Sequence, residues 1–155
     1  MAPRWSKLQK ELYLLRADGL NFQLHCNAYR MASQHGSTDI PRYWITLNGE
    51  TIWDYPKDFI DKPHPAREKP AHYPYSTDIS DISAIIRDYI DTAKDQLLSK
   101  EFQNDHWGLV NILRAADKRI GLRRLPALRG KTGNKAAHRI IEARLFIATE
   151  AKTNN

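Results

Sequence analysis

The chain has 155 residues, of which 41% are hydrophobic and 27% charged, as expected for one globular domain over residues 1–155. Its one cysteine, Cys26, excludes an intramolecular disulfide, and no apolar run resembles a signal peptide or the roughly 20 residues that span a bilayer, so we expect a cytoplasmic protein that does not enter the membrane. The net charge of +6 is confined to residues 101–155, which carry 11 Lys and Arg against 5 Asp and Glu.

Two elements are predicted in the first 30 residues. An apolar stripe at spacings of 3 and 4 predicts a short helix, ended by Asp18-Gly19; its members are Trp5, Leu8, Leu12 and Leu15. Residues 22–29 then alternate between apolar and polar side chains, which indicates a half-buried strand.

The segment RYWITLNGETIWDY, residues 42–55, predicts a β-hairpin. Asn48-Gly49 is a preferred pair for a two-residue turn in which both residues have positive φ. Regular alternation from this turn places Ile45 opposite Ile52 on one face and Trp44 opposite Trp53 on the other. We expect the isoleucine face to pack on the core.

The tryptophan face then needs a cover, and three are open: the following Pro-rich segment, a second copy of the protein, or a ligand. Asp54 joins the rim of this face only if the strand ends or bulges there. Residues 56–75 contain five prolines, which exclude a helix or a central strand. We expect a long loop there, and loops of this length are usually functional or disordered.

Three helices are predicted after the loop. An Ile-rich apolar stripe spans residues 78–100, a second stripe spans residues 105–120 and is ended by Gly121, and a third spans residues 134–149. Residues 150–155 are expected to form a frayed tail. The order predicts an α+β fold, in which a three-strand antiparallel meander packs on three C-terminal helices and is preceded by a short N-terminal helix.

A first candidate site is the basic surface of the C-terminal helices. A localised basic field attracts anionic partners, either nucleic acid or acidic protein. A merely solvated helical face gives the same pattern. The candidate residues are Arg114, Lys118, Arg119, Arg123, Arg124, Lys131, Lys135 and Arg139.

A second candidate site is a small-molecule pocket on the tryptophan face beside the Pro-rich loop, which would suit a ligand-binding protein or an enzyme. Core packing explains the same aromatic side chains equally well. The candidate residues are Arg42, Trp44, Trp53, Tyr55, His72 and Tyr73.

Motifs for catalysis, cofactors or metals are not found. RGKT at residues 129–132 resembles the end of a phosphate-binding loop, but Leu125 stands where the first glycine is required. The six histidines show no paired ligand spacing. Cys26 alternates with apolar residues and is expected to be a buried small hydrophobe. The leading expectation is therefore a non-enzymatic binding module without cofactor.

Three segments of the chain carry a resemblance to known proteins: GSTDIPRYWITLNGETIWDYPKDF, HYPYSTDISDI and WGLVNILRAADKRIG. They resemble small uncharacterised bacterial proteins, including ones carried on mobile gene cassettes such as those of integrons. The resemblance covers most of the chain and implies a bacterial, cytoplasmic, single-domain protein. It implies no activity and no site residues.

A homodimer is also expected. The hairpin offers apolar groups on both faces, and its outer strand has an edge that must be covered or blunted. A two-fold contact would place the same patch of each copy against the other, with Trp44 as an anchor.

Overall fold

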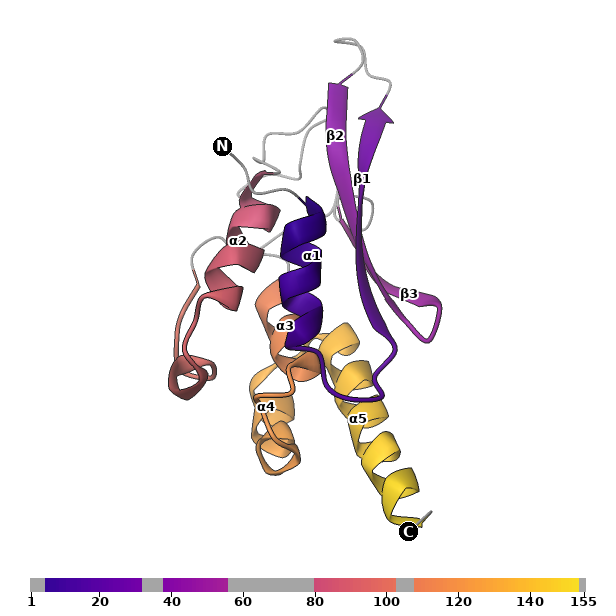
Figure 1. Ribbon diagram of the computed structural model, residues 1–155, viewed down its shortest axis with the longest axis vertical. Helices are drawn as coiled ribbons and strands as arrows, with labels where there is room; N and C mark the ends of the chain where they lie inside the picture. Colours follow the sequence, from indigo (N-terminus) through magenta and orange to yellow (C-terminus); the bar gives the residue numbers. More distant parts are fainter. Residues whose placement is uncertain (1–4, 32–37, 56–79, 103–107, 154–155) are drawn as a thin grey trace.

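The structure is a computed structural model, and it describes residues 5–31, 38–55, 80–102 and 108–153. Three antiparallel strands form one sheet in the order β1–β2–β3, namely β1 (Phe22–Met31), β2 (Thr38–Leu47) and β3 (Glu50–Tyr55). The helices lie beside this sheet and beyond one end of it (Figure 1). The predicted α+β class with a three-stranded antiparallel sheet is confirmed.

One helix precedes the sheet and four follow it among the described residues. They are α1 (Trp5–Leu14), α2 (Ser80–Ile90), α3 (Leu109–Ala116), α4 (Leu125–Lys131) and α5 (Lys135–Thr153), with short 3₁₀ turns η1 (Lys94–Gln96) and η2 (Leu122–Arg124) between them. α1 packs on α2, and α3 packs mainly on α5. The last turns of α5 extend to the end of the molecule opposite the sheet (Figure 1).

The turn between β2 and β3 contains the Asn-Gly pair. Asn48 and Gly49 have φ angles of 53° and 82°, and they connect Leu47 to its ladder partner Glu50. Only glycine, and to a lesser extent asparagine, adopts such angles at low cost.

Beyond the turn the register of the hairpin differs from our prediction. Ile45 pairs with Trp53 rather than with Ile52, because the ladder shifts between Ile45 and Thr46. Such a shift is a β-bulge, in which one extra residue on one strand turns the following side chains to the other face. Trp53 and Tyr55 therefore lie in the core, at 4% and 2% exposure. The prediction that Trp53 shares a face with Trp44 is wrong.

The core face of the sheet packs on α1 and α2. Phe22 and Leu24 of β1 are buried, and so are their ladder partners in β2, Leu47 and Ile45. The Trp5 ring meets the Tyr43 ring edge-on, with centroids 5.5 Å apart. The Tyr43 hydroxyl is hydrogen-bonded to Ser83 Oγ at 2.8 Å, and burial raises the pKa of Tyr43 to about 12.

The helices after the sheet differ in extent from the predicted ones. α2 ends at Ile90 rather than near residue 100, and α3 spans eight residues of the predicted range 105–120. α4 was not predicted. α5 continues to Thr153, four residues beyond the predicted end.

Several expectations lie outside the described residues. These are the Pro-rich loop at residues 56–75 with His72 and Tyr73, the Arg42 side chain, and residues 154–155 of the tail. Within the part that is described, no helix combines the length and the apolar character needed to cross a membrane. The homodimer stays a prediction.

Candidate functional site

A buried carboxylate lies at the centre of the basic third of the chain. Asp117 is 2% exposed and accepts hydrogen bonds from the Tyr89 hydroxyl at 2.6 Å and from the Arg119 guanidinium at 2.8 Å. Burial, and after it the charge of Asp117, raises the pKa of Tyr89 well above its ordinary value. This cluster ties α2 to the end of α3. The sequence analysis missed it, although a lone Asp in the basic segment RAADKR was a usable signal.

Two of the predicted anion-binding arginines are used inside the fold. Arg119 pairs with Asp117 and also donates to the carbonyl of Thr92 at 3.0 Å. Arg114 donates to two carbonyls of the connection after α2, those of Leu97 and Lys100, each at 2.7 Å. Both guanidinium groups therefore stabilise the connection between α2 and α3 rather than adding charge to an open surface.

A third arginine of the same region, Arg144 of α5, is 7% exposed. Its guanidinium donates to the carbonyls of Ala115, Asp117 and Ile120 at distances of 2.8 to 3.1 Å. The last carbonyls of a helix have no partner within the helix. Arg144 satisfies this need at the end of α3 and so fixes α5 against α3.

Two further arginines form exposed ion pairs. Arg139 of α5 makes two hydrogen bonds to Glu50 at the hairpin turn, and these bonds hold the pKa of the Glu50 carboxyl below its ordinary value. Arg129 of α4 pairs with Glu142 of α5 at 3.0 Å. Exposed pairs of this kind contribute little to stability, but they neutralise the charge of both arginines.

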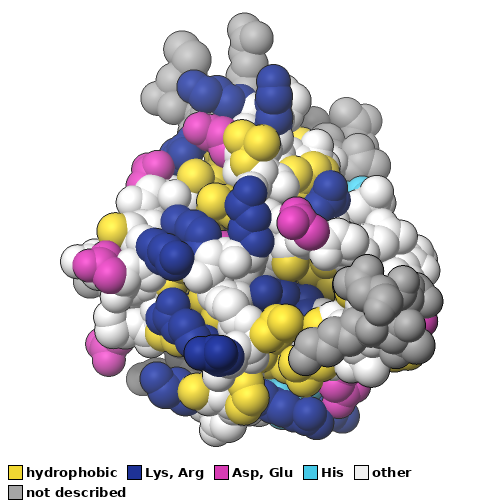
Figure 2. Space-filling model, turned by 60° about the horizontal axis from the view of Figure 1, so that its bottom comes forward, with side chains coloured by type: hydrophobic (Ala, Val, Ile, Leu, Met, Phe, Trp, Pro, Cys, Tyr) yellow, Lys and Arg dark blue, Asp and Glu magenta, His cyan; other side chains and the backbone are white. Residues whose placement is uncertain are grey.

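Five of the predicted cations remain. Lys118 is exposed and follows α3, apart from the others. The other four lie on adjoining elements, and we call them the basic surface: Arg123 and Arg124 of η2, Lys131 of α4 and Lys135 of α5. Arg124 is half-buried and the other three are exposed. Among the residues that the structure describes, no carboxylate forms a salt bridge with any of them. Lys and Arg side chains recur across this end of the molecule, with hydrophobic patches between them (Figure 2).

The basic surface has a defined geometry. Arg124 and Lys131 are seven residues apart, which places them on one side of α4 about two turns, or roughly 10 Å, apart along the axis. The turn to Lys135 is fixed by His138, whose Nε2 donates to the carbonyls of Arg129 and Thr132 at 3.2 and 2.6 Å.

Lys135 stands where an anion is favoured. Asn134 caps α5, its Oδ1 accepting from the Ala137 N–H at 3.0 Å. The first turn of α5 contains no acidic residue, so the positive end of its dipole is not compensated within the helix. The charge of Lys135 adds to this field.

The tryptophan face is rearranged by the bulge. Trp44 pairs across the ladder with Asp54 instead of Trp53, and it stacks on the His25 ring at 4.9 Å between centroids. His25 Nε2 lies 3.0 Å from Thr46 Oγ1. The structure therefore brings Trp44 together with His25 and Asp54, and separates it from Trp53 and Tyr55, which pack in the core. Trp44 therefore does not share a face with Trp53 and Tyr55, while the other predicted members of the aromatic pocket lie outside the described side chains: Arg42, His72 and Tyr73.

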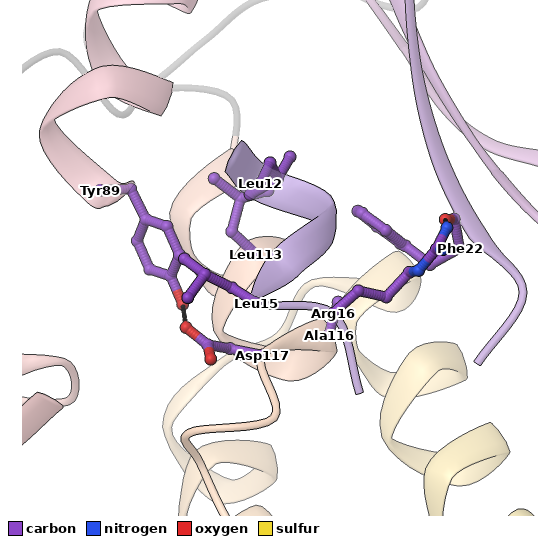
Figure 3. Close-up of a pocket in the computed structure, with 8 residues that line it drawn as sticks. All are labelled: Leu12, Leu15, Arg16, Phe22, Tyr89, Leu113, Ala116 and Asp117. Atoms are coloured by element: carbon purple, nitrogen blue, oxygen red, sulfur yellow. Dashed lines mark hydrogen bonds between the residues drawn. The ribbon is translucent and has the colours of Figure 1, made fainter. Parts of the chain in front are cut away.

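A small cavity adjoins the Tyr89–Asp117 hydrogen bond (Figure 3). Apolar side chains form most of its wall, among them Leu12, Leu113 and Phe22. Its volume of about 10 Å³ is that of a single water molecule, so it is a packing defect and not a ligand site. Over the same described part of the chain, no group of three His, Cys, Asp or Glu side chains has the arrangement of a metal site.

Comparison of the chain with curated proteins, and with solved structures, finds no match. A family model described as the SF0329 protein family matches residues 4–145. The match extends from the start of α1 into α5 and so includes the sheet, the contacts of Asp117 and the basic surface. The chain therefore belongs to the SF0329 protein family.

Proposed function

We propose that the protein is a non-enzymatic binding module whose basic surface engages an anionic partner, either the phosphate backbone of a nucleic acid or an acidic protein. One observation carries the proposal. Arg123, Arg124, Lys131 and Lys135 remain without a carboxylate partner among the described residues, while the neighbouring arginines are paired or used inside the fold.

The arrangement suits a charged backbone more than a compact ligand. The four cations lie on the outside of two helices and a turn, and none of them lines the small cavity beside Tyr89 or the hollow beside Lys118. Backbone binding requires charge and no sequence readout. Four contacts of this kind give non-specific affinities on the order of 10⁻⁴ to 10⁻⁶ M at physiological salt.

The test is a titration of duplex DNA of random sequence at several salt concentrations. Four released counterions predict a slope of roughly −3 to −4 for the logarithm of affinity against the logarithm of salt concentration. Replacing Arg124 or Lys131 by Gln should reduce the slope by about 1 in each case. Lys10→Gln, an exposed charge on α1, is the matched control and should leave it unchanged.

The outcomes separate the two partner classes. Absence of binding at low salt, or an affinity indifferent to salt, excludes the nucleic-acid form of the proposal. If poly-glutamate binds instead and the same substitutions weaken it, the partner is an acidic protein. If neither polymer binds, the basic surface is only a solvated helical face.

A further inference from the structure

A hollow separate from the basic surface lies at the connection between α1 and β1. It is lined by the end of α1, by residues 16–21 and by Lys118, and its volume is about 470 Å³. Small-molecule sites usually occupy about 300 to 1,000 Å³. None of Arg123, Arg124, Lys131 and Lys135 lines it, so an inference about the hollow stands or fails independently of the proposed function.

The walls of the hollow are held in place by three backbone hydrogen bonds, which join the connection to the end of α3 and to the hairpin turn. The Ala17 N–H donates to the Ala116 carbonyl at 2.8 Å, and the Lys118 N–H donates to the Leu15 carbonyl at 2.7 Å. The carbonyl of Asn21 accepts from the hairpin turn at 3.0 Å. These bonds place Lys118, which follows α3, beside a connection almost 100 residues earlier in the sequence.

A glycine fits the turn within this wall against α5. Gly19 has a φ of 77°, and a Cβ at this position would lie 3.4 Å from Ile147 Cγ2. The left-handed backbone favours glycine, whereas the 3.4 Å separation is an ordinary van der Waals contact. This side of the hollow is therefore a turn that packs against Ile147 of α5.

The two cations of the hollow, Arg16 and Lys118, differ in how far their side chains are held by other residues. The Arg16 guanidinium lies over the Tyr13 ring, 4.5 Å from its centroid, and donates from one terminal nitrogen to the Phe22 carbonyl at 2.8 Å. Its other nitrogens make no hydrogen bond to a described residue. The Lys118 side chain is exposed and forms no salt bridge within the described ranges. Arg16 is thus pre-oriented, and Lys118 is free to reach an anion.

The remaining lining decides the class of ligand. Asp18 is the one carboxylate in the wall, so the hollow keeps a net positive charge. Leu14 also lines it and is 65% exposed, which offers an apolar surface beside the two cations. Guanidinium and ammonium groups are the cations that bind phosphate groups in proteins, and one of each belongs to a residue that lines this hollow.

We propose that this hollow binds the phosphate group of an organic phosphate, held between Arg16 and Lys118, with the organic part of the ligand against Leu14. The phosphate could belong to a free small molecule or to the end of a nucleic acid. The shared chemistry is the phosphate, and the source is settled by comparing the two kinds of probe.

The test is a titration of the full chain with phenyl phosphate and with inorganic phosphate, followed by calorimetry or by amide shifts of residues 17–21. Phenyl phosphate should bind more tightly than inorganic phosphate, because only phenyl phosphate reaches Leu14. Lys118→Gln should weaken its binding roughly fivefold, and Asp18→Asn should strengthen it roughly twofold, since an unfavourable charge is removed. Lys94→Gln, which removes an equal exposed charge on η1, outside both the hollow and the basic surface, is the control.

Three results would overturn the proposal: no binding of phenyl phosphate at millimolar concentration, equal losses in Lys118→Gln and Lys94→Gln, or weaker binding in Asp18→Asn. The source of the phosphate group is identified by comparing the affinities of a 5′-phosphorylated oligonucleotide and of its dephosphorylated form. A preference for the phosphorylated form that Lys118→Gln removes assigns the site to a nucleic-acid end. Equal affinity of both forms, with phenyl phosphate still bound, assigns it to a free organic phosphate.

Discussion

The Tyr13 hydroxyl lies against the backbone of Leu24 and satisfies both of its polar groups. The Leu24 N–H donates to Tyr13 Oη at 3.0 Å, and the Tyr13 hydroxyl lies 3.2 Å from the Leu24 carbonyl. Gln9 Nε2 donates to the same carbonyl at 2.7 Å, and Arg16 donates to the carbonyl of Phe22. Because β1 is an edge strand, one side of α1 covers backbone groups that would otherwise be open to pairing with another chain.

Tyr13→Phe should therefore destabilise the protein by about 1 to 3 kcal/mol, the usual cost of leaving a buried backbone group without its partner. Urea unfolding measures the change. Leu14→Ala, at an exposed neighbouring position, is the control and should lie within about 0.5 kcal/mol of the wild type. Equal stability of Tyr13→Phe and the wild type would show that water replaces the hydroxyl at this edge.

Asp117→Asn should cost about 3 kcal/mol or more, because it leaves the Arg119 guanidinium in a largely buried place without its counter-charge. Asp91→Asn removes an exposed partner of Arg87 and should cost less than about 0.5 kcal/mol. A double-mutant cycle of Asp117→Asn with Tyr89→Phe should give a coupling above about 0.5 kcal/mol. Additive losses would mean that the 2.6 Å hydrogen bond contributes nothing to stability.

Because of the bulge in the hairpin, Trp53 and Trp44 differ in how deeply they are buried. Trp53→Ala should cost about 3 to 5 kcal/mol, as expected for a large side chain lost from a core, because Trp53 is 4% exposed. Trp44 is only half-buried, so Trp44→Ala should cost clearly less. Denaturant unfolding of the two variants compares them directly. Equal losses would contradict the observed register and restore the regular one.

Stability should depend on pH through His25. Partial burial lowers the pKa of His25 below its ordinary value, so the unfolded chain binds this proton more strongly than the folded protein does. The contribution of neutral His25 is therefore complete above the ordinary pKa of about 6.5 and is lost as the pH falls below it. Unfolding free energies at pH 7.5 and pH 5.5 should differ more in the wild type than in His25→Gln. The same difference in both proteins would assign the effect to other groups.

The class of the fold and the presence of α1, β1 and β2 could be predicted because their apolar periodicity agrees with their packing, although β1 continues to Met31 and β2 begins at Thr38, beyond the predicted bounds 22–29 and 42–47. Leu8 and Leu12 of α1, and Phe22 and Leu24 of β1, are buried as their spacing indicates. The bulge could not be predicted, since strict alternation gives no sign of one inserted residue. Its effect is large because the side chains of β3 beyond Ile52 lie on the opposite face of the sheet from the one that regular alternation predicts.

The end of α2 at Ile90 could not be predicted from the sequence for a different reason. The apolar spacing continues to Leu97, which is buried, yet the chain leaves the helix after Ile90. Arg119 and Arg114 bind the carbonyls of Thr92 and Leu97, so side chains far along the sequence take acceptors that a continuous helix would use itself. For the same reason the charge pattern overstated the basic surface: composition counts an arginine but does not show where its donors point.

The contacts of Arg144 also make the packing of α3 depend on a residue far along the chain. The chain is made from the N-terminus. The residues of α3 are therefore synthesised well before Arg144, whose guanidinium donates hydrogen bonds to the carbonyls at the end of α3. Until Arg144 has been added, the carbonyls of Ala115, Asp117 and Ile120 lack the guanidinium that joins them, although the Asp117 carbonyl still accepts from the Ile120 N–H at 3.1 Å. A chain truncated before position 144 should therefore lack the contact that fixes α5 against α3, and it should hold these two helices together less firmly.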